Sequence, residues 1–97
     1  MKKKKLPKYA LHLYIAGLSS RSQKAIENIK KICEEYLVGR HELVIHDIYQ
    51  DPTLAKNGQI LAAPTLIKKF PLPLRRFVGD LSNTEKLIVG LDLRTKP

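Results

Sequence analysis

The side chains able to act as nucleophiles or metal ligands are few, and Cys33 is the only thiol among the 97 residues. One cysteine excludes an internal disulfide and a metal site made of cysteines alone. A reactive cysteine typically lies at a helix N-terminus, where its thiolate is stabilised. Cys33 lies instead in the middle of an apolar stripe with helical spacing, so the sequence predicts that it packs in the core.

The histidines also lack a catalytic or metal-binding pattern. His12 has no second His, Cys or carboxylate at motif spacing, which predicts an ordinary histidine on a strand face. His46 and Asp47 are neighbours on a predicted strand, so their side chains point to opposite faces and cannot act together on one substrate. The sequence has no Gly-rich phosphate loop and no Ser/His/Asp arrangement either. It therefore predicts a binding protein rather than an enzyme, with neither cofactor nor metal.

The N-terminal half alternates strand, helix and strand. Residues 9–16 form a predicted strand whose apolar residues on one face are Leu11, Leu13 and Ile15. A capping box of Ser20 and Gln23 starts a helix, and apolar positions recur at helical spacing until Gly39 ends it. Residues 41–48 form a second strand. Strand, helix and strand within about 40 residues predict a right-handed unit with parallel strands.

The C-terminal half begins with a short helix, for which Asp51 is the N-cap and Pro52 the first helical residue. Residues 66–70 and 75–78 are predicted strands joined by a proline-rich turn. A second capping box at residues 82–85 then starts the last helix. The predicted order is therefore β-α-β-α-β-β-α, in one α/β domain of the thioredoxin-like class.

Pro64 lies between the apolar run 60–63 and Thr65, where a proline starts or interrupts a strand. The stretch resembles the cis-proline turn of thioredoxin-like folds, and an ordinary trans proline at a strand start is the alternative. Thioredoxin chemistry also needs two cysteines at the start of the first helix. The corresponding residues 17–21 contain no thiol, so dithiol exchange by this chain is excluded. A thioredoxin-like stress or redox-adaptation protein, with Cys33 as its redox handle, is the alternative function.

The formal net charge is +9, and Lys2 to Lys5 supply four of these charges. We expect residues 1–8 to form a disordered basic tail and residues 9–95 to form the single domain. The basic residues are not interleaved with stacking aromatics, so no specific nucleic-acid partner is predicted. No apolar run approaches the roughly 20 residues of a membrane span. No apolar segment follows the basic N-terminus, so a signal peptide is not expected and a cytoplasmic location is.

Several stretches together resemble the KaiB family of bacterial circadian clock proteins, over about residues 9–93. They read Leu13-Tyr14-Ile15-Ala16-Gly17, Asp51-Pro52 with Leu54-Ala55, Ile60-Leu61-Ala62-Ala63-Pro64-Thr65-Leu66, Arg75-Arg76, Gly79-Asp80-Leu81-Ser82 and Gly90-Leu91-Asp92-Leu93. The resemblance implies a non-enzymatic protein that binds the N-terminal ring of the hexameric ATPase KaiC. It also implies a resting homo-dimer or homo-tetramer, and a histidine kinase as a further partner, but no membrane partner.

The same resemblance implies where partners bind and which segment changes its fold. The expected partner-binding residues are Tyr9, Gln59, Ile60, Leu61, Arg75 and Arg76. The C-terminal half of such proteins refolds, from helices ending in a strand to two strands ending in a helix. This chain departs from the clock proteins at residues 18–22, at residues 56–59 and at its C-terminus. Acidic groups of those proteins are missing at the last two places. Charge complementarity with a partner is therefore expected to differ from theirs.

Residues 85–93 have both strand and helix periodicity, which places the expected fold switch there. Gly90 and Asp92 both weaken the helical alternative, through helix propensity and through the helix dipole. Gly90→Ala with Asp92→Arg is therefore expected to favour the helix by about 1–2 kcal/mol. Slow isomerisation at prolines is expected to make the exchange slow. The prolines concerned are Pro64, Pro71 and Pro73.

Overall fold

The computed structural model describes residues 7–57, 63–79 and 81–93. It has the predicted order, β1 (Tyr9–Ile15), α1 (Ser20–Tyr36), β2 (His41–Asp47), α2 (Pro52–Asn57), β3 (Thr65–Phe70), β4 (Arg75–Val78) and α3 (Thr84–Gly90). The strands form one sheet in the order β2-β1-β3-β4. β1 and β2 are parallel, as the intervening α1 requires, and the other two pairs are antiparallel. β2 and β4 are therefore the two edges.

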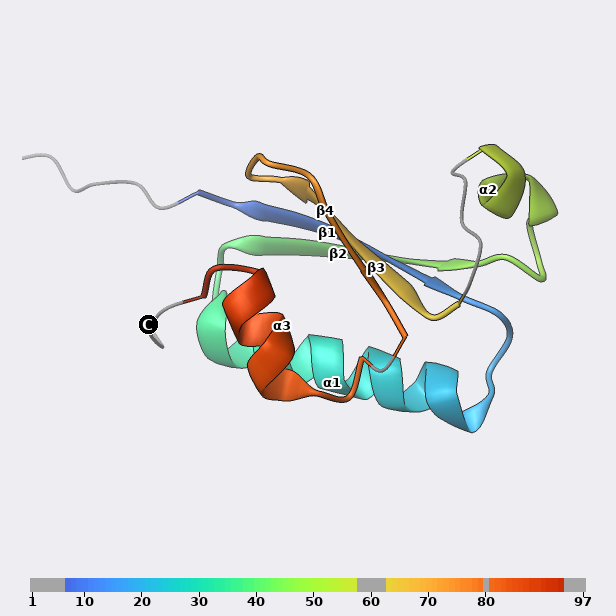
Figure 1. The fold of residues 1–97 in the computed structure, drawn as a ribbon, viewed down its shortest axis with the longest axis horizontal. Coiled ribbons are helices and arrows are strands. Elements are labelled where there is room, and N and C mark those ends of the chain that lie inside the picture. Colours follow the sequence, from blue (N-terminus) through green and yellow to red (C-terminus); the bar gives the residue numbers. More distant parts are fainter. Residues whose placement is uncertain (1–6, 58–62, 80, 94–97) are drawn as a thin grey trace, which may run out of the picture.

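α1 and α3 cover one face of this sheet, whereas α2 lies beyond its end, opposite the β3–β4 turn (Figure 1). The core lies between the sheet and the two helices. Alternate residues of β1 face it because side chains on a strand alternate between its faces. The buried residues are Tyr9, Leu11, Leu13 and Ile15 from β1, Ala25, Ile29, Ile32 and Cys33 from α1, Leu37 after α1, and Leu66, Leu81, Leu87, Leu91 and Leu93 from the C-terminal half. The predicted core position of Cys33 is confirmed.

In both α1 and α3 the N-cap lies one residue away from the predicted one. Ser19, not Ser20, caps α1, because its side chain accepts from the amide of Ser22. Asn83, not Ser82, caps α3, because its side-chain oxygen accepts from the amide of Lys86. Ser and Asn are both good N-caps, so adjacent candidates compete and the backbone path decides between them.

The C-terminal end of α3 closes in a Schellman motif. The amide of Asp92 donates to the carbonyl of Val89 at 3.1 Å, and the amide of Leu93 donates to that of Ile88 at 2.9 Å. This closure places Asp92 in the left-handed region, with φ 59°, where glycine is the usual residue. Of the two periodicities in residues 85–93, the helical one is therefore realised in this structure.

Two features of the structure oppose the expectation that Gly90→Ala with Asp92→Arg favours this helix. A Cβ at Gly90 would lie 2.3 Å from Cε2 of Phe77, so alanine cannot enter without moving that ring. Arginine at position 92 would adopt a left-handed conformation that asparagine and aspartate tolerate better. Sequence propensity misjudged both residues, because neither the contact with β4 nor the left-handed φ is a local property of the helix.

The peptide bonds preceding Pro64, Pro71 and Pro73 are all cis. The thioredoxin-like geometry expected at Pro64 is therefore present, and the bond leads directly into β3. The other two prolines lie in the turn that joins β3 to β4. No helix in the described part of the chain is long and apolar enough to cross a membrane.

Candidate partner-binding surface

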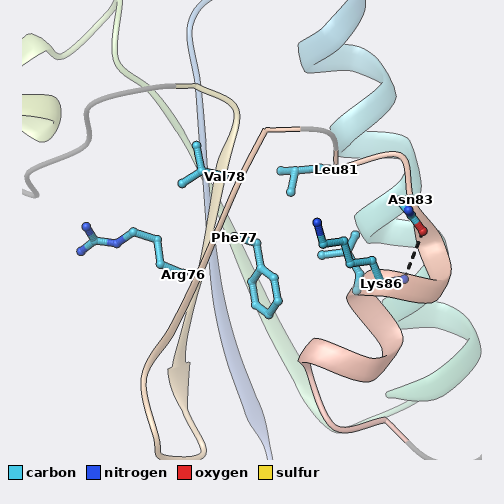
Figure 2. Close-up of a pocket in the computed structure, with 7 residues that line it drawn as sticks. Arg76, Phe77, Val78, Leu81, Asn83 and Lys86 are labelled. Carbon is cyan, nitrogen blue, oxygen red and sulfur yellow. Dashed lines mark hydrogen bonds between the residues drawn. The ribbon is translucent and has the colours of Figure 1, made fainter.

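Arg75 and Arg76 lie on the edge strand β4, and both are exposed. Arg75 pairs with Lys68 and Arg76 with Ile67, so the two arginines point to opposite faces of the sheet. Figure 2 shows Arg76 directed away from Phe77, which faces α3. The two predicted contact residues therefore place one guanidinium group on each side of the sheet edge rather than forming a single patch.

A pocket of about 280 Å³ opens between β4 and α3 (Figure 2). Phe77 and Leu87 are among its apolar lining residues, and Lys86 reaches toward Phe77 from α3. Its remaining lining residues are Arg76, Val78, Leu81 and Asn83. Because Gly90 has no Cβ, the ring of Phe77 can approach the helix closely there. The pocket thus depends on the packing of β4 against α3.

Tyr9 is buried, with 5% of its surface exposed, and does not join the arginines on the surface. Its hydroxyl donates a 2.8 Å hydrogen bond to the carbonyl of Leu91, at the end of α3. Burial, and then the nearby carboxylate of Asp92, raise the pKa of Tyr9. In this structure Tyr9 therefore ties β1 to the end of α3, and its ring is not accessible to a partner.

Lys68 connects the buried tyrosine to the edge strand. Its ammonium nitrogen lies 6.0 Å from the centre of the Tyr9 ring, and only 4% of the residue is exposed. Burial is the main cause that lowers the pKa of Lys68; the neighbouring Arg75 adds to it, and Asp92 opposes it. Lys68 thus lies over the Tyr9 ring and is also the residue that Arg75 pairs with in the sheet. The other predicted contacts, Gln59, Ile60 and Leu61, lie outside the described residues.

Sequence reasoning missed a pair of histidines on the face of the sheet opposite α1 and α3. Nδ1 of His12 lies 2.9 Å from Nε2 of His46, and Tyr14 stacks on the His46 ring with centroids 4.6 Å apart. His12 and His46 are 34 residues apart, so no motif spacing could reveal them. The prediction that His12 lies on a strand face is confirmed, but its contact with His46 was not foreseen. The pair could have been predicted only from the parallel register of β1 and β2, which sets His46 opposite Tyr14 and so next to His12.

The surroundings of the histidine pair disfavour its protonated forms. Burial, and then Lys69, lower the pKa of His12 and of His46. Glu42 opposes this effect at His12, and Asp51 opposes it at His46. The short N···N contact requires one imidazole to donate to the other, so at most one of the two can carry a charge while the bond persists.

Neither the cysteine nor a metal-binding group offers a reactive site in the described part of the chain. Only 1% of Cys33 is exposed, and burial, assisted by Glu34, raises the pKa of its thiol to about 11. The thiolate is the reactive form, so Cys33 is a poor nucleophile at neutral pH. Within residues 7–57, 63–79 and 81–93, no three His, Cys, Asp or Glu side chains form a group able to hold a metal ion.

Comparison with known proteins shows similarity over most of the chain. The KaiB domain family matches residues 12–93. The circadian clock protein KaiB3 of Synechocystis sp. is 49% identical over 83 residues, which cover 86% of this chain and 81% of that protein. The circadian clock oscillator protein KaiB of Synechococcus elongatus is 46% identical over 85 residues, which cover 88% and 83%.

Solved structures show the same fold at lower sequence identity. The N-terminal domain of Synechococcus elongatus SasA superimposes with a TM-score of 0.71 at 18% identity, covering 97% of this chain and 92% of that domain. Mitochondrial thioredoxin 3 of Saccharomyces cerevisiae gives 0.69 at 17% identity, covering 89% and 78%. The fold is therefore thioredoxin-like, and on the match over residues 12–93 this chain belongs to the KaiB family.

Proposed function

We propose that this chain is a non-enzymatic cytoplasmic regulator that binds a KaiC-like ATPase ring and modulates its phosphorylation rhythm or timer output. The observation that carries the proposal is the KaiB domain match over residues 12–93, with identities of 49% and 46% to clock proteins. The buried, weakly acidic Cys33 argues against the alternative of a thiol-based redox protein.

The thioredoxin-like arrangement supports binding by this form of the chain. In the family, the form with two C-terminal strands and a final helix is the expected binding state, and this chain adopts that order. Tyr9 contributes by holding the end of α3 through Leu91 rather than by touching the partner. Arg75 and Arg76, exposed on both sides of β4, are the proposed direct contacts among the described residues.

The positive charge of Arg75 and Arg76 predicts an acidic partner surface. Residues 52–79 contain no Asp or Glu, so the whole stretch around the arginines is basic or neutral. A partner surface with carboxylates opposite β4 would complement it, and such pairs act mainly on association rate and specificity. Residues 59–61 are proposed as further contacts from the family resemblance alone, since they lie outside the described residues.

The test is complex formation with the KaiC from the same organism. The two proteins are mixed with ATP, incubated for hours and separated by size exclusion. Co-elution is expected, and Arg75→Glu with Arg76→Glu should weaken the complex at least tenfold by placing like charges together. Lys30→Glu with Lys31→Glu, an exposed basic pair on α1, is the matched control and should leave it nearly unchanged. Absence of a complex after long incubation would contradict the proposal.

A further inference from the structure

The β3–β4 turn exposes large apolar side chains at one end of the molecule (Figure 1). Leu72 is 74% exposed, Leu74 is 55% exposed and Phe70 is 51% exposed. We call residues 70–74 the apolar turn. Exposed apolar side chains that gather in one place commonly mark a site of contact with a protein or a membrane.

Exposed cations flank the apolar turn on both strands. Lys69 precedes it on β3, and Arg75 and Arg76 follow it on β4. β1 begins at the same end, since Ala10 pairs with Phe70, and the exposed Lys8 lies just before β1. Residues 69–76 contain no Asp or Glu; Glu42 lies opposite Ala10 on β2, and Asp92 follows α3.

The backbone of the apolar turn suits immersion in an apolar medium. Pro71 and Pro73 have no N–H group, so two of its residues carry no amide donor that would lose its hydrogen bond to water. An unsatisfied backbone group in hydrocarbon is costly, and prolines reduce the number of such groups.

We propose that the apolar turn docks this chain on the surface of an anionic lipid bilayer, with Leu72 and Leu74 among the headgroups and Lys69, Arg75 and Arg76 against lipid phosphates. Binding of this kind combines buried apolar area with attraction to anionic lipids. It departs from the sequence-based expectation of no membrane partner, since surface docking needs no apolar run long enough to span a bilayer. The inference does not depend on the proposed KaiC binding, although it uses the same two arginines.

The experiment uses the full chain and vesicles of phosphatidylcholine with and without phosphatidylglycerol, in the absence of KaiC. The chain contains no tryptophan, so Leu72→Trp introduces a single reporter in the apolar turn. Its emission should shift to the blue with anionic vesicles, and less so at high salt. Leu18→Trp is the matched control, because Leu18 is 72% exposed beyond the other end of β1. Its emission should stay unchanged.

Vesicle flotation separates the contributions of the apolar side chains, of the arginines and of residues 2–5 to membrane binding. Leu72→Ser with Leu74→Ser should lower the partition coefficient roughly tenfold, whereas Leu18→Ser should not lower it. Arg75→Gln with Arg76→Gln should lower it about 25-fold, at roughly fivefold for each cation near an anionic surface. Deleting residues 2–5 should lower the partition coefficient without abolishing the Leu72→Trp shift. Circular dichroism confirms that each variant is folded.

Three outcomes would overturn the proposal. The first is no flotation with anionic vesicles at low salt. The second is an equal effect of the serine substitutions at Leu18 and at the apolar turn, which would indicate charge attraction alone. The third is a Leu72→Trp emission that vesicles leave unchanged but that shifts in a separate, lipid-free sample containing KaiC, which would make the turn a protein contact. Since the vesicles contain no KaiC, failure here leaves the proposed KaiC binding untouched.

Discussion

Replacing Gly90 by alanine should destabilise this fold, although helix propensity alone predicts the opposite. The new Cβ would lie 2.3 Å from Cε2 and 2.9 Å from Cζ of Phe77, both well inside van der Waals contact. Phe77 is partly buried and packs against the main core, next to Leu87 in the pocket between β4 and α3. Its ring must therefore swing outward and give up part of that packing.

The net effect follows from two opposing contributions. Alanine stabilises a helix interior by about 1 kcal/mol relative to glycine. Overpacking by one methyl group typically costs about 1–3 kcal/mol. We therefore expect Gly90→Ala to lower the free energy of unfolding by about 1 kcal/mol, or roughly fivefold in the folded-to-unfolded ratio.

A double-mutant cycle with Phe77→Leu isolates the contact, because leucine lacks the two ring atoms that the new Cβ meets. In that background Gly90→Ala should instead stabilise the fold by about 1 kcal/mol, which gives a coupling of about 2 kcal/mol. Urea unfolding followed by circular dichroism measures each value. The four proteins must be compared at one concentration and oligomer size, since association shifts apparent stability. If Gly90→Ala raises stability equally in both backgrounds, the steric argument fails.

Three further predictions test the contacts described above. Tyr9→Phe removes the donor to the Leu91 carbonyl and should lower the free energy of unfolding by about 1–2 kcal/mol; an unchanged urea midpoint would show that this bond contributes nothing. Burial lowers the folded-state pKa of His12 and of His46, so the unfolded chain binds protons first as pH falls, and stability should decline below about pH 6.5. His12→Gln should flatten that decline in unfolding measured from pH 7.5 to 5, and an unaltered slope would contradict this assignment. Asp92→Arg should lower the melting temperature, whereas Asp92→Gly should preserve or raise it, because φ at this position is 59°, a conformation that favours glycine. The reverse order of melting temperatures would show that the left-handed conformation at position 92 does not limit stability.

The element order and the core-facing residues could be predicted because they depend on local periodicity. Leu11 and Leu13 alternate with polar or aromatic neighbours, and the stripe through Ile29 and Ile32 recurs every three to four residues. Those patterns determine which face of an element is buried, whatever it packs against. The caps at Ser19 and Asn83 were each missed by one residue, because adjacent polar residues are equally able caps and only the chain path selects one.

The sequence by itself therefore determined the class of fold, the order of its elements, the burial of Cys33 and the resemblance to one family. The tertiary structure alone decided which side chains meet across elements. Strand register brought His12 to His46, and docking of α3 buried Tyr9 against Leu91 and set Gly90 against Phe77. A local pattern specifies the face on which a residue lies. Its partner on that face is specified by register and packing between segments far apart in the chain, which no short stretch of sequence contains.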